Sequence, residues 1–139
     1  MASLDPQSAL FTTAQVRALD QAAIGDGIAG IELMERAARA ALDALRRRWP
    51  QARRVRVLCG PGNNGGDGFL LAALARAAGL QADVIALSAR PSGDAARARE
   101  RFTGEGGQVS SITGALPEAD VYVDALFGSG LNRAPAGDA

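Results

Sequence analysis

Residues 55–71 form a continuous stretch that reads V-R-V-L-C-G-P-G-N-N-G-G-D-G-F-L-L. It opens with a short apolar run that ends at Cys59, and a helix-like apolar segment begins at Phe69. Every residue between them is glycine, proline, asparagine or aspartate. An apolar strand, a glycine-rich turn and a helix start together are the sequence form of a phosphate or nucleotide cradle. The stretch therefore predicts a ligand-binding loop between a strand and a helix.

The residues of this loop have the types that ligand binding needs. Asn63 and Asn64 tolerate left-handed backbone and carry both hydrogen-bond donors and acceptors. Asp67 stands where we expect the helix to begin, so it can cap the first amides or hold a ligand hydroxyl. Glycine permits positive φ and lets a ligand approach the backbone closely. We expect both properties to be used at the loop glycines, which are Gly60, Gly62, Gly65, Gly66 and Gly68.

A simple βα turn without a ligand is the alternative interpretation of this loop. Such a turn needs only a few special residues, whereas here almost every position is special, which favours binding. The loop has neither the lysine and Ser/Thr of a P-loop nor the Rossmann spacing G-x-G-x-x-G. The pattern thus indicates a nucleotide cradle of a different kind.

A second glycine-containing segment follows the predicted strand 121–125. Asp124 lies at the carboxyl end of that strand, and Gly128–Arg133 follow it. In an open α/β sheet, ligands bind beyond the carboxyl ends of the strands, where strand order reverses. We therefore expect strands 55–59 and 121–125 to be adjacent and parallel, so that Asn63–Asp67 faces Gly128–Arg133. The alternative is that Asp124 caps a turn and that the glycines form a flexible connection.

The remaining pattern alternates helices and strands. We expect helices from Thr12 or Thr13 to about residue 24, then over 30–49, 69–78 and 94–102, and further strands over 84–87 and 109–112. Alternating β and α elements with short loops predict a parallel sheet with helices on both faces.

Composition narrows the function classes. With 139 residues the chain has the length of one domain, and its formal net charge is zero. No net field therefore favours nucleic acid or a membrane surface as a partner. The absence of histidine excludes histidine acid–base chemistry, and the single Cys59 excludes an internal disulfide and is expected to be buried and inert. Since neither a signal peptide nor a membrane-length apolar run is present, we expect a cytoplasmic location.

Three segments carry a resemblance to a known family. G-P-G-N-N-G-G-D-G after a hydrophobic strand, the helix with Leu33, Met34 and Glu35, and V-D-A-L-F-G-S-G-L-N-R over 123–133 resemble the NAD(P)H-hydrate epimerases, also called YjeF N-terminal domains. The resemblance implies a Rossmann-like three-layer αβα sandwich with a mainly parallel sheet. It further implies one domain over 1–139, with a helical part over 12–49 and a nucleotide-binding α/β part over 54–139.

The activity that the resemblance implies is an isomerisation. The substrate is NADH or NADPH with water added across a ring double bond, and the enzyme interconverts the R and S epimers. A companion NAD(P)H-hydrate dehydratase, fused or separate, then restores the cofactor, and a homodimer through the N-terminal helices is a further candidate partner. The alternative is a non-catalytic dinucleotide-binding or protein-interaction module derived from the same fold.

The resemblance also assigns roles to residues. It implies a K⁺ ion bound by oxygen ligands, with Asn64 and Asp124 as two of them, and Arg133 is suited to pairing with a phosphate. Asp67 is the carboxylate that we expect to act as the acid–base group. The implied substrate contacts are Asn63, Asn64, Gly65, Gly66, Asp67, Gly128, Ser129, Gly130, Leu131, Asn132, Arg133 and Ala134.

The resemblance further implies that the family domain continues past Ala139. We therefore expect the C-terminal strands to be missing, so that strand 121–125 becomes an edge with unpaired backbone groups. Because a domain of this length has little stability in reserve, we expect the chain to be poorly soluble or oligomeric and to turn over hydrated NAD(P)H weakly or not at all.

Overall fold

The structure is a computed structural model that describes residues 14–15, 18, 22, 29–87 and 90–128. The elements, in chain order, are α2 (Gly30–Arg48), β1 (Arg54–Cys59), α3 (Asn63–Ala77), β2 (Gln81–Ala86), α4 (Gly93–Gly104), β3 (Val109–Ser111) and β4 (Val121–Ala125). The helix predicted from Thr12 or Thr13 lies mostly outside the described residues. The described positions within it, 14–15, 18 and 22, are helical.

The four strands form one parallel sheet in the order β3-β2-β1-β4. β1 pairs with β2 on one side, and on the other side it pairs with β4 from Val55↔Val121 to Cys59↔Ala125. Strand order therefore reverses at β1, and its carboxyl end and that of β4 lie at the same edge. The predicted adjacency of strands 55–59 and 121–125 is confirmed. Within the described part of the chain, β4 is an edge strand, also as predicted.

Buried and more exposed side chains alternate along β1, and this alternation shows which face of the sheet is covered. In β1, Val55, Val57 and Cys59 are fully buried, whereas the intervening Arg54 is exposed and Arg56 is half-buried. The buried row belongs to a core cluster that includes α3, as the period of two in a strand requires. On the other face Arg56 forms an ion pair with Asp83 of β2.

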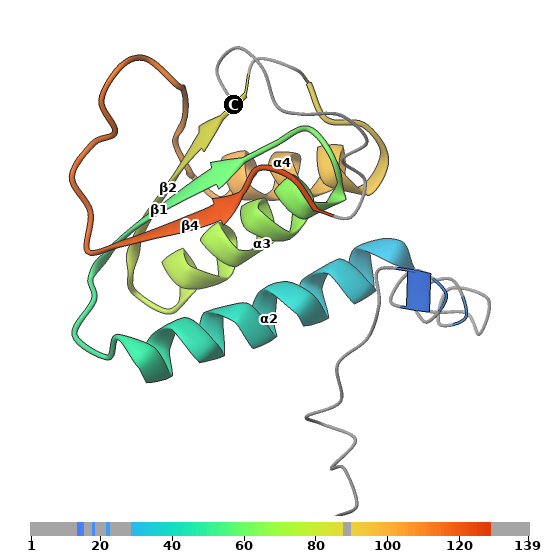
Figure 1. The fold of residues 1–139 in the computed structure, drawn as a ribbon, viewed down its shortest axis with the longest axis horizontal. Helices are drawn as coiled ribbons and strands as arrows, with labels where there is room; N and C mark the ends of the chain where they lie inside the picture. Colours follow the sequence, from blue (N-terminus) through green and yellow to red (C-terminus); the bar gives the residue numbers. More distant parts are fainter. Residues whose placement is uncertain (1–13, 16–17, 19–21, 23–28, 88–89, 129–139) are drawn as a thin grey trace, which may run out of the picture.

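α3 is the central helix of the described domain. It contacts β1, β2 and β4 on one side and α2 and α4 on its flanks (Figure 1). Its residues from Phe69 to Ala75 are all buried, which is why this segment reads as uniformly apolar instead of amphipathic. α2, in contrast, buries only one stripe, namely Met34, Ala38, Leu42 and Leu45.

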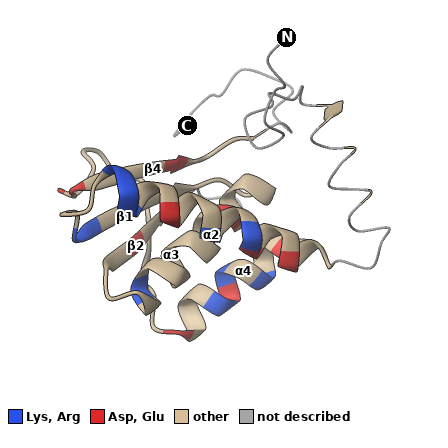
Figure 2. Cartoon of the chain, turned by 90° about the horizontal axis from the view of Figure 1, so that it is seen from below, with Lys and Arg blue, Asp and Glu red and all other residues tan. Residues whose placement is uncertain are grey.

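Figures 1 and 2 show α2, α3 and α4 on the same side of the sheet. This follows from the topology, since β1-α3-β2 and β2-α4-β3 advance in the same direction and such crossovers are right-handed. The α/β class and the mainly parallel sheet predicted from sequence are confirmed. Of the three predicted layers, the described residues form the sheet and the helical layer on one of its faces, and the helices expected on the other face are not among them. No described helix is long and apolar enough to cross a membrane.

The largest difference from the sequence prediction is the start of α3. We expected the helix to begin at Phe69, after an irregular glycine loop, and this is wrong: α3 begins at Asn63. The glycine-rich residues form its first turns, because contacts with neighbouring elements outweigh their poor helix propensity. β2 also begins earlier than predicted, at Gln81, since the polar Gln81 and Asp83 occupy the less buried face of an otherwise apolar strand.

Asp120 fixes the beginning of β1 next to β4. Its Oδ2 accepts hydrogen bonds from the backbone N–H groups of Arg53 and Arg54, both at 2.8 Å. The N–H of Asp120 in turn donates to the carbonyl oxygen of Arg54 at 2.9 Å. The two backbone hydrogen bonds, the stronger from Arg54, lower the pKa of the Asp120 carboxyl.

The contact of α3 with the sheet yields a prediction about Gly68. A Cβ at Gly68 would lie 2.7 Å from Ala125 Cβ and 2.8 Å from Cys59 Sγ. Gly68→Ala should therefore lower the free energy of unfolding by about 1–3 kcal/mol through overpacking, measured by urea unfolding. Gly104→Ala is the matched control, because a Cβ there meets no atom within 4 Å. It should be neutral or stabilise by up to about 1 kcal/mol, and equal effects of the two substitutions would contradict this packing.

Candidate functional site

The candidate site begins where β1 ends and α3 starts. Gly62 is the N-cap residue of α3, with extended backbone, and no side chain caps the helix. The first bond of the helix runs from Gly66 N–H to the carbonyl oxygen of Gly62. The amides of Asn63, Asn64 and Gly65 precede that bond and have no carbonyl partner inside the helix. Such a helix start, with its positive dipole end, binds anions.

The segment after β4 lies directly beside this helix start. Gly60 N–H donates to the carbonyl oxygen of Ala125 at 2.9 Å. A Cβ at Gly60 would lie only 1.8 Å from Leu126 O, and one at Gly128 would lie 3.2 Å from Asn64 Cβ. The two glycine-containing segments therefore meet at the carboxyl edge of the sheet, as predicted for Asn63–Asp67 and Gly128. Residues 129–134, the rest of the second predicted segment, lie outside the described residues.

The glycines of the first segment serve close packing. The expectation that they adopt positive φ is wrong, since the described residues with positive φ are Gly79, Gly93, Gly106 and Gly114. A Cβ at Gly65 would lie 1.8 Å from the carbonyl oxygen of Gly60, so only glycine lets the chain fold back there. Asn63 and Asn64 do not use the left-handed geometry that their side chains tolerate, because both are helical.

Gly62 is the exception among these glycines. Its φ of −87° and ψ of −169° are open to any residue, and a Cβ there would meet no protein atom within 4 Å. Neither backbone conformation nor packing within the described residues explains a glycine at this position. Glycine is among the residues favoured at an N-cap, and the missing side chain leaves the backbone open to close approach.

The three polar side chains of the first segment lie on the first turns of α3. Asn63 is exposed, whereas Asn64 and Asp67 are half-buried. The predicted capping role of Asp67 is wrong, because the helix starts at Asn63 and Asp67 comes one turn later. Asp67 is instead a helical carboxylate set close behind the open amides.

Asp124 stands at the end of β4, one residue before Ala125. It is exposed, and its Oδ1 accepts a hydrogen bond from Leu126 N–H at 3.1 Å. It lies opposite Leu58 in the strand register, on the face of the sheet away from the buried Cys59. The described residues contain no cluster of three or more Asp, Glu, Cys or His side chains that could hold a metal. A metal ion shared by Asn64 and Asp124 stays a prediction, and amide, carboxylate and backbone oxygens are the donors it would find here.

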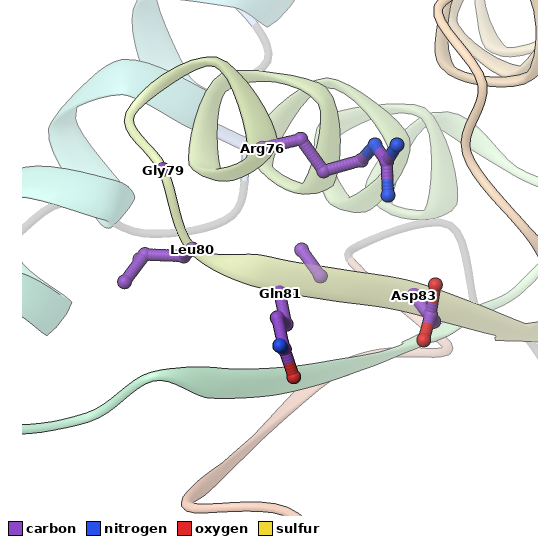
Figure 3. A pocket seen from close by; sticks show the side chains of 6 residues that line it. Arg76, Gly79, Leu80, Gln81 and Asp83 are labelled. Carbon is purple, nitrogen blue, oxygen red and sulfur yellow. The ribbon is translucent and has the colours of Figure 1, made fainter.

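Other candidate groups lie outside this site. Cys59 is buried beneath α3, and its burial raises the thiol pKa far above its ordinary value, so it stays protonated as expected. An open cavity of about 340 Å³ lies between the end of α3 and the start of β2, where Arg76 projects above Gln81 and Asp83 (Figure 3). It is at the amino edge of the sheet, opposite to the helix start, and so belongs to a different part of the molecule.

The sequence analysis missed the role of Glu35 and its partners. The carboxylate of Glu35 binds Arg39 at 2.8 Å within α2 and Arg101 of α4 at 3.0 Å. The hydrogen bond from Arg39, followed by that from Arg101, lowers the pKa of Glu35. The spacing of Glu35 and Arg39 by four residues indicates an ion pair on one helix, but no sequence signal indicates the contact with Arg101.

Known proteins resemble this chain over most of its length. The family model described as "YjeF-related protein N-terminus" matches residues 30–139. The "Bifunctional NAD(P)H-hydrate repair enzyme Nnr" of Escherichia coli K12 is 45% identical over 112 residues, which cover 78% of this chain and 22% of that protein. The "NAD(P)H-hydrate epimerase" of Rhodobacter capsulatus is 39% identical over 142 residues, which cover 89% of this chain and 64% of that protein.

A solved structure has the same fold. The crystal structure of yeast YNL200c superposes with a TM-score of 0.79 at 21% identity, covering 92% of this chain and 60% of that one. The chain thus spans less than two thirds of each of these relatives. Because the family model covers well over half of the residues, the chain belongs to the family of YjeF-related N-terminal domains.

Proposed function

We propose that this chain is the nucleotide-binding part of an NAD(P)H-hydrate epimerase. The substrate would be hydrated NADH or NADPH, and the reaction would interconvert its R and S epimers for nicotinamide nucleotide repair. The observation that carries the proposal is the uncapped start of α3 beside Gly128, with a glycine at position 62 that packing among the described residues does not require. The names of the relatives from E. coli and R. capsulatus support the same activity.

The site offers a place for the dinucleotide's charge. The amides of Asn63, Asn64 and Gly65 are donors for the diphosphate, which would lie at the positive end of the α3 dipole. The absence of a side chain at Gly62 leaves room for that approach. Arg133, among the residues outside the described range, is proposed as a bidentate phosphate partner, and Ser129–Ala134 as further contacts.

The chemistry requires a proton donor near the hydrated ring. The reacting carbon is a hemiaminal: a proton passes to its hydroxyl, the C–O bond breaks with loss of water, and an iminium remains. Water then adds to the other face of the iminium and releases a proton, which replaces the proton consumed in the first step. Asp67 is proposed to hold and return this proton, because it is a half-buried carboxylate one turn inside the helix that binds the substrate.

A K⁺ ion is proposed near the same place. The side-chain oxygens of Asn64 and Asp124, with neighbouring backbone carbonyls, form the hard-oxygen donor set that such an ion prefers. The ion would offset the negative charge that the dinucleotide brings close to Asp124. This proposal can be tested by thermal unfolding, without an activity assay. KCl should raise the melting temperature more than an equal concentration of NaCl does, and Asp124→Asn should abolish that difference.

Partners and location follow from the same proposal. A companion NAD(P)H-hydrate dehydratase, fused or separate, would use the epimer that this enzyme supplies, and a name such as "Bifunctional NAD(P)H-hydrate repair enzyme" supports that link. A homodimer through the N-terminal helices and a cytoplasmic location are part of the proposal. The competing function is nucleotide binding without catalysis.

Activity distinguishes these two functions. The 139-residue chain is supplied with one purified epimer of hydrated NADPH, and formation of the other epimer is followed by chromatography. Asp67→Asn should reduce the rate by about 100-fold or more, as loss of a general acid–base group does. Asp43→Asn, an exposed position on α2, is the matched control and should leave the rate unchanged. Binding without measurable epimerisation by the unaltered chain would favour the non-catalytic module.

Substitution of Gly62 separates binding from stability. Gly62→Ala should leave the free energy of unfolding within about 0.5 kcal/mol, because the poorer N-cap and the less flexible unfolded chain offset each other. Its affinity for hydrated NADPH should fall by about tenfold, since the new methyl group occupies the approach of the ligand. Isothermal titration and urea unfolding measure the two quantities.

Gly65→Ala gives the opposite pattern and serves as the comparison. The Cβ would overlap the carbonyl oxygen of Gly60 at 1.8 Å, so this variant should lose stability first. Unchanged affinity in Gly62→Ala would remove the support that Gly62 gives to the site.

A further inference from the structure

We propose that Glu35 is a positioning residue for the nucleotide site: by joining α2 to α4, it holds Met34 and Ala95 against Gly66 and so keeps the first turn of α3 ordered. The effect of Glu35 on ligand binding rests on the proposed function. Its effect on the order of the first turn of α3 is independent of that function.

The first turns of α3 cannot be held by intrinsic helix propensity. Residues 63–68 read N-N-G-G-D-G, with three glycines, two asparagines and an aspartate. Each glycine inside a helix costs about 1 kcal/mol relative to alanine, and Asn and Asp are also poor helix formers. In addition, no side chain caps the helix. The helical conformation of these residues must therefore come from their neighbours.

Residues of two helices pack against the Cα of Gly66, at the place where a Cβ would lie. A Cβ at Gly66 would lie 2.6 Å from Met34 Sδ of α2 and 3.1 Å from Ala95 Cα of α4. The N-terminal part of α2 also reaches α4 directly, since a Cβ at Gly30 would meet Asp94 Oδ2. Gly66 is thus enclosed between α2 and α4, and its backbone position depends on how far apart they stand.

Glu35 makes the ionic connection between these two helices. Its Oε1 accepts from Arg39 Nη2 at 2.8 Å and its Oε2 from Arg101 Nη1 at 3.0 Å, while Arg101 Nε donates to Glu105 Oε1 at 3.3 Å. Among the described residues this Glu35–Arg101 contact is the only ion pair between two helices. Charged residues of both signs line α2 and α4 in Figure 2, but the other helical pairs stay within one helix.

The position of Glu35 in the sequence links its ion pair to the packing at Gly66. It is the residue after Met34, so a carboxylate fixed to α4 also fixes the backbone from which the Met34 side chain reaches Gly66. Loss of the ion pair would let α2 and α4 separate around Gly66. The glycine-rich turn, and the amides of Asn63–Gly65 with it, would then sample non-helical conformations.

The test uses Glu35→Gln, which keeps the shape of the side chain and removes its charge. Backbone amide hydrogen exchange should become faster by about tenfold over Gly66–Gly68, whose amides lie at or after the first hydrogen bond of α3, while Val57 in β1 keeps its protection. The dissociation constant for hydrated NADPH should rise by about three- to tenfold. Glu32→Gln breaks a pair inside α2, with Arg36 at 3.5 Å, and is the matched control that should change neither quantity.

Arg101→Gln and the double variant Glu35→Gln/Arg101→Gln complete a double-mutant cycle. If the two residues act together, Arg101→Gln should reproduce the local exchange effect, and the double variant should be no worse than either single one. Uniformly faster exchange throughout the domain would show a merely structural role and would overturn the proposal. Unchanged exchange over Gly66–Gly68 would overturn it as well. If the unaltered chain does not bind hydrated NADPH, the proposed function fails, yet the exchange data still decide whether Glu35 orders the turn.

Discussion

The domain depends on the close contact between the glycine-rich start of α3 and the carboxyl ends of β1 and β4. At Gly68 the helix lies so near the sheet that a single methyl group would collide with Ala125 and Cys59. At Gly60 and Gly65 the backbone of one segment touches that of another. Glycine is required at these positions because of space and not because of backbone conformation, since none of them has positive φ.

This contact also creates the functional surface. Because α3 starts immediately after a short turn, its uncapped amides open at the edge where strand order reverses between β1 and β4. The carboxylates of Asp67 and Asp124 lie near that edge, one on the helix and one at the end of the neighbouring strand. Packing that brings the two segments together thus places the open amides of α3 and the carboxylates of Asp67 and Asp124 near the edge of the sheet where the proposed site lies. Glu35 extends this relation to α2 and α4, which enclose Gly66.

Much of the fold and the place of the site could be predicted from sequence. The apolar runs around Val57 and Val123 gave the central strands, and the rule for ligand sites in open α/β sheets gave their common edge. The start of α3 could not be predicted, because N-N-G-G-D-G has the composition of a loop and is helical only through contacts with Met34, Ala95 and the strand ends. For the same reason the glycines were expected to have positive φ. A sequence records that a residue is small but not which neighbour requires it to be small. The ion pair of Glu35 with Arg101 could not be predicted either, because the two residues lie 66 positions apart in the sequence.

If the open start of α3 binds the dinucleotide, the backbone amide chemical shifts of that segment will change on binding. A ¹⁵N-labelled chain is titrated with hydrated NADPH, and the shift of each assigned amide is followed to saturation. We expect the largest changes at Asn63, Asn64, Gly65 and Gly128, with little change around Gly79 and Gln81 at the opposite edge. Changes concentrated at the cavity beside Arg76, or none at the start of α3 at saturating ligand, would contradict this expectation.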